Sequence, residues 1–359
     1  MRLDFNIEAK DYSDILKYYK INPKEALFFD IETTGFTAKT SKLYMIGAVY
    51  FENESGIYKG IQWFDEDGRQ LKSIVDEFFE FTKDFSTLIH FNGDRFDIPY
   101  MRDTANNLGI ISPLDSMNSL DIYKKAKCLK PALKLENVKQ KSVEKFLRIY
   151  REDQMSGGDL IEVYRKNLAI RSNEAERLLL LHNRNDIEGL VNILPILSYS
   201  IVTEDNFKLT SYNINDSDIE LAFEIKIPVP IRVATSLDDI TLNIYENEGV
   251  LKIPFYKGVL KFFYEDYKNY YYLPLEDEAM HKSVATFVDK EYRENAKASN
   301  CYSKKEGVFM PQYEQIYSQK FLKNYNDKIS YFEKDLFEQS DSELIGQYIA
   351  HIVRLVLTK

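Results

Sequence analysis

The chain is poor in the residue types that most often build disulfides or soft-metal sites. Among its 359 residues are two cysteines and four histidines. Cys128 and Cys301 lie far apart and in no metal-ligand spacing, which argues against a disulfide framework and predicts a reducing compartment. Residues 1–5 show no secretory leader, and no apolar run looks long enough to cross a bilayer, so we expect a cytoplasmic protein without membrane segments.

Positive charge is also scarce, because 57 acidic residues outnumber 47 Lys and Arg, for a net charge of −10. A nucleic-acid-binding surface normally carries the opposite balance. The exception is the segment 124–151, which holds ten Lys and Arg against two acids, Glu136 and Glu144. This basic segment is either a solvated helix surface or a track for phosphates.

What the sequence does contain is enough apolar material for two cores. Hydrophobic residues make up 44% and aromatic residues 14% of the chain, and a length of 359 residues suits two domains. The hydrophobic pattern changes near residue 203. We therefore predict one domain over residues 1–202 and a second over residues 203–359.

The first domain is predicted to be α/β, with a mixed sheet flanked by helices, because strands are followed by a helix, a strand and more helices. The predicted strands are 26–32, 43–51, 57–64 and 87–91, with a turn at 53–56. The predicted helices are 71–83, one from about 98, one or two over 133–149 with a polar stretch at 139–142 between them if there are two, one capped by Asp159, and 173–198 with a kink at Pro195.

The second domain is predicted to be a smaller α+β accessory domain of unknown role. A protein partner would suit it, and its mixture of tyrosines and basic residues would also suit single-stranded nucleic acid. The predicted elements are a strand at 219–227 that ends before Pro228, hairpins of 240–245 with 250–255 and of 261–264 with 270–273, a helix from about 276, and a C-terminal helix over 344–356.

Two acids stand side by side on a presumed buried strand. Asp30 and Glu32 are two residues apart, and side chains alternate faces along a strand, so both carboxylates point the same way. Buried together, they are unfavourable unless something neutralises them. A hard divalent cation does so, since carboxylates are its preferred ligands. The alternative is an edge strand with its acids in water.

Three more side chains are candidates to join this pair. Asp97 falls where a short strand crosses into a helix, although a loop Asp is also often a helix cap. Asp94 lies in the intervening turn and is expected to support it. His182 and Asp186 are four residues apart in an apolar helix, hence on one face. Their alternative role is a satisfied pair that holds the helix to its neighbours.

In this order the pieces resemble the DEDD superfamily of 3′–5′ exonucleases, which have the RNase H-like fold. The runs 29–33, 92–97 and 182–186 look like its three motifs, and the second is similar to the version in proofreading domains of family B DNA polymerases. Within the superfamily, the chain looks most similar to uncharacterised bacterial ribonuclease H-like proteins. One feature departs from the pattern, because a catalytic His usually precedes the last Asp by five residues and His182 precedes Asp186 by four.

The resemblance implies two-metal hydrolysis of phosphodiester bonds in DNA or RNA with a free 3′ end. Asp30, Glu32, Asp97 and Asp186 would hold two Mg²⁺ or Mn²⁺ ions, and His182 would orient or deprotonate the water. Further residues are candidates for substrate binding, namely Thr33, Asn92, Lys124, Lys125 and Lys134, although Thr33 and Asn92 would serve equally as turn residues. The alternatives are a structure-specific endonuclease with the same site and a non-catalytic scaffold that binds nucleic acid or protein.

Overall fold

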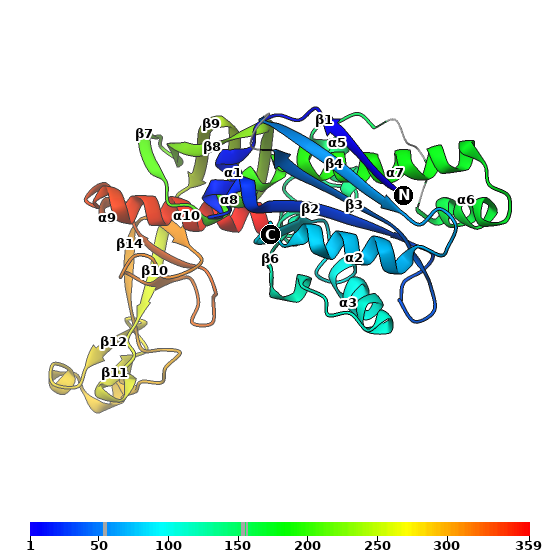
Figure 1. Cartoon of the computed structure of the whole chain (residues 1–359). Coiled ribbons are helices and arrows are strands. Elements are labelled where there is room, and N and C mark those ends of the chain that lie inside the picture. The colour runs from blue at the N-terminus through cyan, green and yellow to red at the C-terminus, as the bar shows by residue number, and fades with distance from the viewer. Residues whose placement is uncertain (53–55, 152–154, 156) are drawn as a thin grey trace. The chain divides into compact units, whose positions relative to one another are not determined.

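The computed structural model describes residues 1–52, 56–151, 155 and 157–359 (Figure 1). The chain divides into two compact units. The N-terminal unit comprises Met1–Ile201, Ile227–Ile231 and Thr358, and the C-terminal unit comprises Val202–Lys226, Arg232–Leu357 and Lys359. Each unit is described by itself.

The N-terminal unit is built on a six-stranded mixed sheet with the order β1-β4-β3-β2-β5-β6. The neighbouring pairs β1–β4, β4–β3 and β3–β2 are antiparallel, whereas the pairs β2–β5 and β5–β6 are parallel. The predicted α/β class with a mixed sheet is therefore confirmed. The strands are β1 (Arg2–Ile7), β2 (Ala26–Thr33), β3 (Leu43–Glu52), β4 (Ile57–Phe64), β5 (Thr87–His90) and β6 (Asn118–Asp121).

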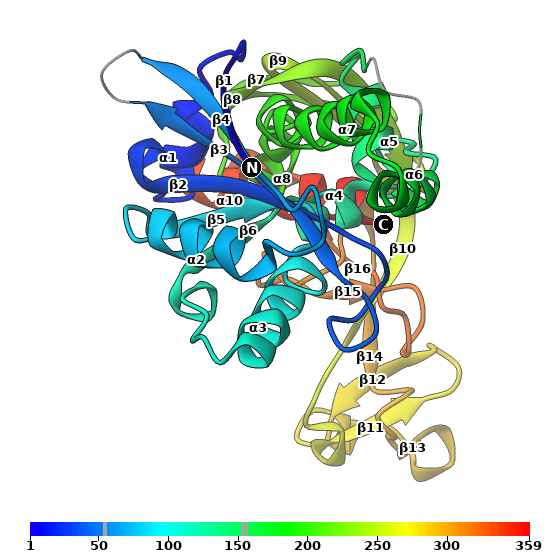
Figure 2. The same ribbon diagram turned by 45° about the vertical axis from the view of Figure 1, so that its right-hand side comes forward.

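Helices cover both faces of this sheet (Figure 2). On one face, α2 and α3 pack against Phe29 and Ile31 of β2 in a core that also includes Trp63 and Phe78. The opposite face, to which Asp30 and Glu32 point, is covered by α7. The helices of this unit are α1 (Ser13–Tyr18), α2 (Leu71–Thr82), α3 (Asp97–Leu108), α4 (Ile122–Leu129), α5 (Gln140–Phe146), α6 (Gly157–Ala169), α7 (Asn173–Asn192) and α8 (Ile196–Glu204), which runs on into the C-terminal unit.

The long apolar helix predicted over 173–198 is divided into α7 and α8, and α8 begins directly after Pro195. By length and composition, the 32-residue stretch Asn173–Glu204 is apolar enough to cross a membrane, so the expectation that no run is long enough was wrong. Of its most apolar window, 72% is buried inside the protein, as in the core helix of a globular fold.

Two further predictions for this unit were wrong. Of the one or two helices expected over 133–149, the structure has only the short α5, because Pro131 follows the end of α4 and Lys134 adopts a left-handed backbone with φ of 52°. Asp159 lies within the first turn of α6 and not before it. Of the turn expected at 53–56, residues 53–55 lie outside the described residues.

The C-terminal unit is mostly β structure, with a closed barrel of β10, β14, β16 and β15 and a small sheet of β12, β11 and β13. A third sheet has the order β7-β8-β9. Its strands are β7 (Lys208–Ile214), β8 (Asp218–Leu237), β9 (Ile240–Pro254), β10 (Tyr256–Phe263), β11 (Tyr270–Leu273), β12 (Glu278–His281), β13 (Glu294–Asn295), β14 (Tyr302–Gln312), β15 (Phe321–Leu322) and β16 (Ser330–Glu333). The chain also contains α9 (Lys334–Glu338) and the predicted C-terminal helix α10 (Ser342–Thr358).

Local patterns misled the prediction of this unit. β8 continues through Pro228 and Pro230, which is tolerated because β7 pairs with β8 only as far as Glu224. β9 runs unbroken where a hairpin was expected, and β10 pairs with β14 and β15 instead of β11. The helix expected from 276 is wrong, since β12 pairs with β11 there and short 3₁₀ turns follow.

Candidate metal centre

Asp30 and Glu32 lie on β2, which is paired on both sides in the sheet. Asp30 stands opposite Gly47 of β3, and Glu32 stands opposite Met45. Asp30 is partly buried and Glu32 is only 9% exposed. A register irregularity follows Glu32, and such bulges re-aim side chains at the ends of strands. The alternative of an exposed edge strand is therefore wrong.

Asp97 reaches this strand because β5 ends early. Pairing between β2 and β5 stops at Phe28 and Ile89, so Asp30–Glu32 extend beyond β5. Asp97, the first residue of α3, fills the space: its Oδ1 accepts the backbone N–H of Ile31 at 3.2 Å. The carboxylate is 4% exposed. The short β5 and the start of α3 thus place a third carboxylate beside the first two.

Gly47 lets α7 approach the sheet beside Asp30. A Cβ atom at this position would lie 2.3 Å from Oδ1 of Asn183, a residue of α7. Gln62 of β4 stands next to Gly47 in register and donates from its Nε2 to Asn183 Oδ1 and to the backbone carbonyl of Leu180, both at 2.9 Å. Because cross-strand neighbours share a face, these contacts hold α7 over Asp30.

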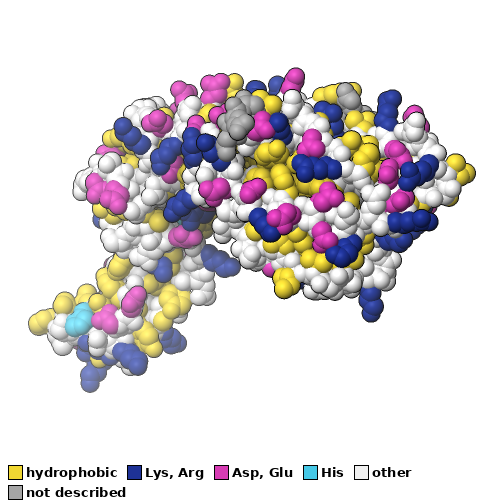
Figure 3. All heavy atoms as spheres, viewed as in Figure 1, with side chains coloured by type: hydrophobic (Ala, Val, Ile, Leu, Met, Phe, Trp, Pro, Cys, Tyr) yellow, Lys and Arg dark blue, Asp and Glu magenta, His cyan; other side chains and the backbone are white. Residues whose placement is uncertain are grey.

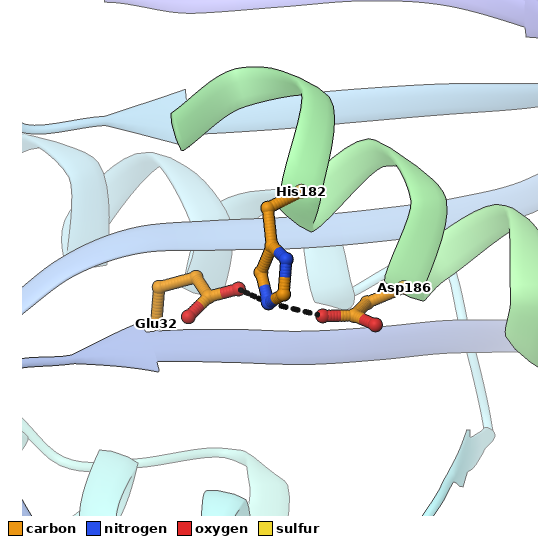
Figure 4. A group of neighbouring side chains, drawn as sticks. All are labelled: Glu32, His182 and Asp186. Carbon is orange, nitrogen blue, oxygen red and sulfur yellow. Dashed lines mark ion pairs between the residues drawn. The ribbon is translucent and has the colours of Figure 1, made fainter. Parts of the chain in front are cut away.

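His182 and Asp186 extend from α7 toward Glu32 (Figure 4). The Nε2 atom of His182 lies 3.1 Å from Oδ2 of Asp186 and 3.8 Å from Oε1 of Glu32. Ligand atoms of all three residues lie within 4.8 Å of one another, which is close enough to share one metal ion. The four-residue spacing therefore allows His182 and Asp186 to converge on the same carboxylate.

Burial and the charges of neighbouring carboxylates shift the pKa values of Asp30 and Glu32. The pKa of Asp30 is raised well above its ordinary value, first by burial and then by the charges of Asp97, Asp186 and Glu32. Burial and the charge of Asp186 likewise raise the pKa of Glu32. Burial also raises the pKa of Asp97 to about 7, against the opposing effect of its backbone hydrogen bonds. The ionised carboxylates thus lack sufficient neutralising charge.

Two residues that the sequence did not assign to this site contact it, and a third residue contacts one of these two. The Arg151 guanidinium pairs with Oδ1 of Asp186, and its Nε lies 3.4 Å from Oε2 of Glu144 on α5. Its charge lowers the pKa of Asp30 and Glu32, against the effect of burial. The Tyr44 hydroxyl donates to Oε2 of Glu32 at 3.4 Å. The available sequence signal for Arg151 was its place in the basic segment, whereas Tyr44 and Glu144 carried none.

The chemistry of this centre suits hard divalent cations. Oε1 of Glu32 is buried and has no hydrogen-bond partner among the described residues. Carboxylate oxygens are the ligands that Mg²⁺ and Mn²⁺ prefer, and a cation among them would offset the repulsion that raises their pKa values. The residues present therefore fit such ions.

The predicted substrate-binding residues have other contacts. The Thr33 hydroxyl donates to the carbonyl of Gly35 at 2.7 Å, and Asn92 has a left-handed φ of 69°, so both are engaged in turns. Lys124 pairs with Asp94, and Nζ of Lys125 lies 5.0 Å from the ring centre of Tyr19. Lys134 is exposed in the turn before α5. Their roles toward a substrate stay predictions.

A second cluster, composed of His90, Asp94 and Asp121, also has metal-ligand spacing. Both ring nitrogens of its histidine are used within the protein: Nδ1 of His90 accepts the N–H of Gly93 at 3.0 Å, and Nε2 lies 2.9 Å from the Ser119 hydroxyl. That hydroxyl in turn donates to Asp94 at 2.6 Å. Burial lowers the pKa of His90, which suits a neutral ring. We interpret this cluster as structural support for the turn before α3.

Comparisons with known proteins give one family match and several distant structural similarities. The family model described as the RNase_H superfamily matches residues 27–198. No curated protein matches the chain. Among solved structures, a family B DNA polymerase from the archaeon Pyrobaculum calidifontis is similar at 14% identity and a TM-score of 0.42, over 93% of this chain and 42% of that one.

Two structures of exonuclease I show weaker similarity. A product-bound form has 12% identity and a TM-score of 0.30 over 55% of this chain and 58% of that one. A zinc-bound Escherichia coli complex with single-stranded DNA has 12% identity and a TM-score of 0.28 over 44% of this chain and 42% of that one. This chain thus spans about half the length of these matches. The family match and the mixed sheet together show that residues 27–198 carry an RNase H-like fold.

Proposed function

We propose that this protein is a metal-dependent nuclease, and specifically a 3′–5′ exonuclease acting on DNA or RNA. The observation that carries the proposal is the convergence of Asp30, Glu32, Asp97 and Asp186, in which burial and the charges of Asp97 and Asp186 raise the pKa values of Asp30 and Glu32. Carboxylates held together against their own repulsion are typical of a site built for cations rather than for stability. The match of residues 27–198 to the RNase_H superfamily supports the same class of enzyme.

In this mechanism the four carboxylates would hold two Mg²⁺ or Mn²⁺ ions. Such ions would supply positive charge to the attacking and leaving oxygens of the phosphodiester. Asp30 and Asp97 approach from β2 and the start of α3, whereas Asp186 approaches from α7. The rigid sheet and helix therefore fix the distances between ligands, which favours a defined position for the scissile phosphate.

In this proposal His182 orients the water or accepts its proton. Its Nε2 faces the carboxylates of Glu32 and Asp186, so the ring points into the same space as the proposed metal ligands. Histidine is the side chain that most often serves as a general acid or base in enzymes. The proposal therefore gives His182 a catalytic role, and metal ligation beside Glu32 and Asp186 is the alternative that the spacing also allows.

The test uses single-stranded and double-stranded DNA and RNA, labelled at the 5′ end and incubated with Mg²⁺, Mn²⁺ or EDTA. We expect metal-dependent shortening from the 3′ end, seen as a ladder of labelled products. Matched substrates with a blocked 3′ end should resist digestion. Continued cutting of blocked substrates would support the endonuclease alternative, and no cleavage of any substrate with Mn²⁺ would support the scaffold.

A further inference from the structure

One of the ten cationic side chains of the basic segment 124–151 contacts the metal centre directly. Arg151 contacts Asp186 through Nη2, and its side chain is only 9% exposed. By contrast, Lys124 pairs with Asp94, and the side chain of Lys124 is 57% exposed. A buried guanidinium next to proposed catalytic carboxylates is the feature that the proposed mechanism does not use.

Arg151 has a second anchor that does not depend on Asp186. Its Nε lies 3.4 Å from Oε2 of Glu144, whose side chain is 3% exposed. Glu144 is itself held, because Gln140 donates from Nε2 to Oε1 of Glu144 at 3.0 Å and to the backbone carbonyl of Asp186 at 2.8 Å. The guanidinium therefore contacts Glu144 of α5, and the neighbouring Gln140 also contacts the backbone of α7.

Gly189 of α7 makes this close contact with Glu144 and Gln140 possible. A Cβ atom at Gly189 would lie 2.4 Å from Oε1 of Glu144 and 2.5 Å from Nε2 of Gln140. The absence of a side chain lets α5 and α7 approach at the turn that follows Asp186. The packing of the two helices thus sets the position of Arg151 beside the centre.

The contact between Arg151 and Asp186 competes with metal binding. Oδ1 of Asp186 pairs with Arg151 and Oδ2 lies 3.1 Å from His182, so both oxygens face nitrogen atoms. A divalent cation at Asp186 would repel the guanidinium and take over the neutralisation of the carboxylate. Arg151 would then keep Glu144 as its partner, and the donor that now contacts Asp186 would be available to another anion beside the centre.

We infer that Arg151 is a phosphate-binding residue of this centre, held by Glu144 and directed from Asp186 to the phosphodiester of a nucleic acid when divalent ions occupy the carboxylates. The inference rests on the proposed function and names a further residue of the same site. A guanidinium suits this role because its planar fork of donors can bind two phosphate oxygens at once.

The test measures metal binding and nucleic-acid binding separately in the full chain. Because Arg151→Met alone leaves Glu144 buried without its partner, the variant is Arg151→Met with Glu144→Gln, and Glu144→Gln alone is the matched control. Arg151→Lys keeps the charge without the fork. Mn²⁺ affinity is measured by calorimetry, and affinity for a single-stranded oligonucleotide with phosphorothioate 3′ linkages is measured by anisotropy in saturating Mn²⁺. Thermal unfolding verifies that each variant is folded.

We expect the double variant to bind Mn²⁺ as tightly as the control or more tightly, and to bind the oligonucleotide about ten-fold or more weakly, the usual size of a lost charge-assisted contact. Arg151→Lys should be intermediate. Unchanged oligonucleotide affinity in the double variant would overturn the inference. So would parallel loss of Mn²⁺ and oligonucleotide in both Arg151 variants, since Arg151 would then only position Asp186.

These outcomes are separate from those of the proposed function. A wild-type protein that binds the oligonucleotide through Arg151 but hydrolyses no nucleic acid would contradict the nuclease and leave the inference standing. If the wild type cleaves nucleic acid and the double variant binds it normally, the nuclease proposal stands and the role of Arg151 is contradicted. A wild-type protein that binds no oligonucleotide would overturn the role of Arg151.

Discussion

At the scale of single residues, the metal centre brings carboxylates of like charge together, which lowers the stability of the metal-free protein. Burial and mutual repulsion raise the pKa values of Asp30 and Glu32, so the ionised pair is destabilising until a cation binds. Sites of this kind commonly become more stable when their charges are removed, at the expense of activity. The same two side chains therefore offer a test in which activity and stability should change in opposite directions.

Asp30→Asn combined with Glu32→Gln should abolish metal-dependent hydrolysis while making the metal-free protein more stable by about 0.5–2 kcal/mol, because the amides remove the repulsion without changing volume. The rise in melting temperature that Mn²⁺ causes in the wild type should disappear. Scanning calorimetry with and without Mn²⁺ measures the stability and the shift in melting temperature, and the labelled-substrate assay measures hydrolysis. Asp103→Asn, at a side chain that is 62% exposed, is the control. Undiminished hydrolysis in the double variant would contradict the assignment of these ligands.

His182→Ala should lower kcat by about 10²-fold or more, the usual contribution of a general base, while Mn²⁺ affinity stays within a few-fold of the wild type. The reason is that Nε2 of His182 faces Glu32 and Asp186, which hold the ions in the proposed mechanism. Single-turnover kinetics and a Mn²⁺ titration separate the two effects. Loss of Mn²⁺ binding would instead make His182 a ligand.

At the scale of secondary-structure elements, the close approach of α7 to the sheet decides whether the carboxylates meet. Gly47→Ala would place a methyl group 2.3 Å from Oδ1 of Asn183, so α7 must shift. We expect a stability loss of about 1–3 kcal/mol, the usual cost of overpacking, and a loss of activity that persists at temperatures where the variant is folded. Gly157→Ala, where nothing lies within 4 Å, is the control. Full activity in Gly47→Ala would show that the position of α7 tolerates this shift.

Residues that recur at a local spacing could be read from the sequence, and contacts between distant elements could not. The pair Asp30 and Glu32 and the pair His182 and Asp186 were visible because strand and helix periodicity places each pair on one face. Arg151 and Glu144 became part of the site only through the packing of α5 on α7. An isolated glycine in a strand signals a close approach, so Gly47 was the available clue to that packing.

The second half of the chain shows where such reading fails. Met280, Val284 and Tyr292 recur at helical spacing, yet the backbone around Met280 pairs with Tyr271 in a sheet. β9 passes through residues that resemble a turn, including Glu246 with a φ of 51°. Partners far apart in sequence, such as β10 and β14, determine these strands. Local propensity carries little information about pairing of this kind.

The C-terminal helix offers a stability test that is independent of the centre. Nε2 of His351 accepts the backbone N–H groups of Tyr313 and Glu314 at 3.2 and 3.1 Å, which requires a neutral ring. Burial lowers the pKa of His351, aided by the charges of Arg354 and Lys359 and opposed by that of Glu314. Below about pH 6.5, the ordinary pKa of histidine, His351 is protonated in the unfolded chain. In the folded protein its ring stays neutral until the pH reaches the lowered pKa.

The contribution of His351 to stability should therefore be complete above about pH 6.5 and decline as pH falls from there toward the lowered pKa of the folded state. Each unit of pKa difference corresponds to about 1.4 kcal/mol. His351→Gln, which keeps an acceptor but does not titrate, should reduce the loss of melting temperature between pH 7.5 and pH 5.5. Identical pH profiles for the two proteins would show that His351 does not titrate in this range.

At the scale of the whole molecule, the charge distribution predicts how nucleic acid is held. The chain carries a net charge of −10, and on the face shown in Figure 3 basic side chains are dispersed among acidic ones. Proteins that bind through many lysines and arginines release a counterion at each phosphate contact. This protein instead offers carboxylates for divalent ions, and its Lys124 is already paired with Asp94.

Binding of a single-stranded oligonucleotide should therefore depend strongly on divalent ions and weakly on monovalent salt. We expect the slope of log K against log[KCl] to lie near −1, the value for about one or two phosphate contacts, because each contact on a single strand contributes about −0.7. Anisotropy titrations between 50 and 300 mM KCl, at constant Mn²⁺ and with a phosphorothioate substrate, measure this slope. A slope near −4 would instead indicate a basic track, and Lys124, Lys125 and Lys134 would then be the first positions to change to Gln. The two results assign the recognition of nucleic acid either to the metal centre or to the wider basic segment.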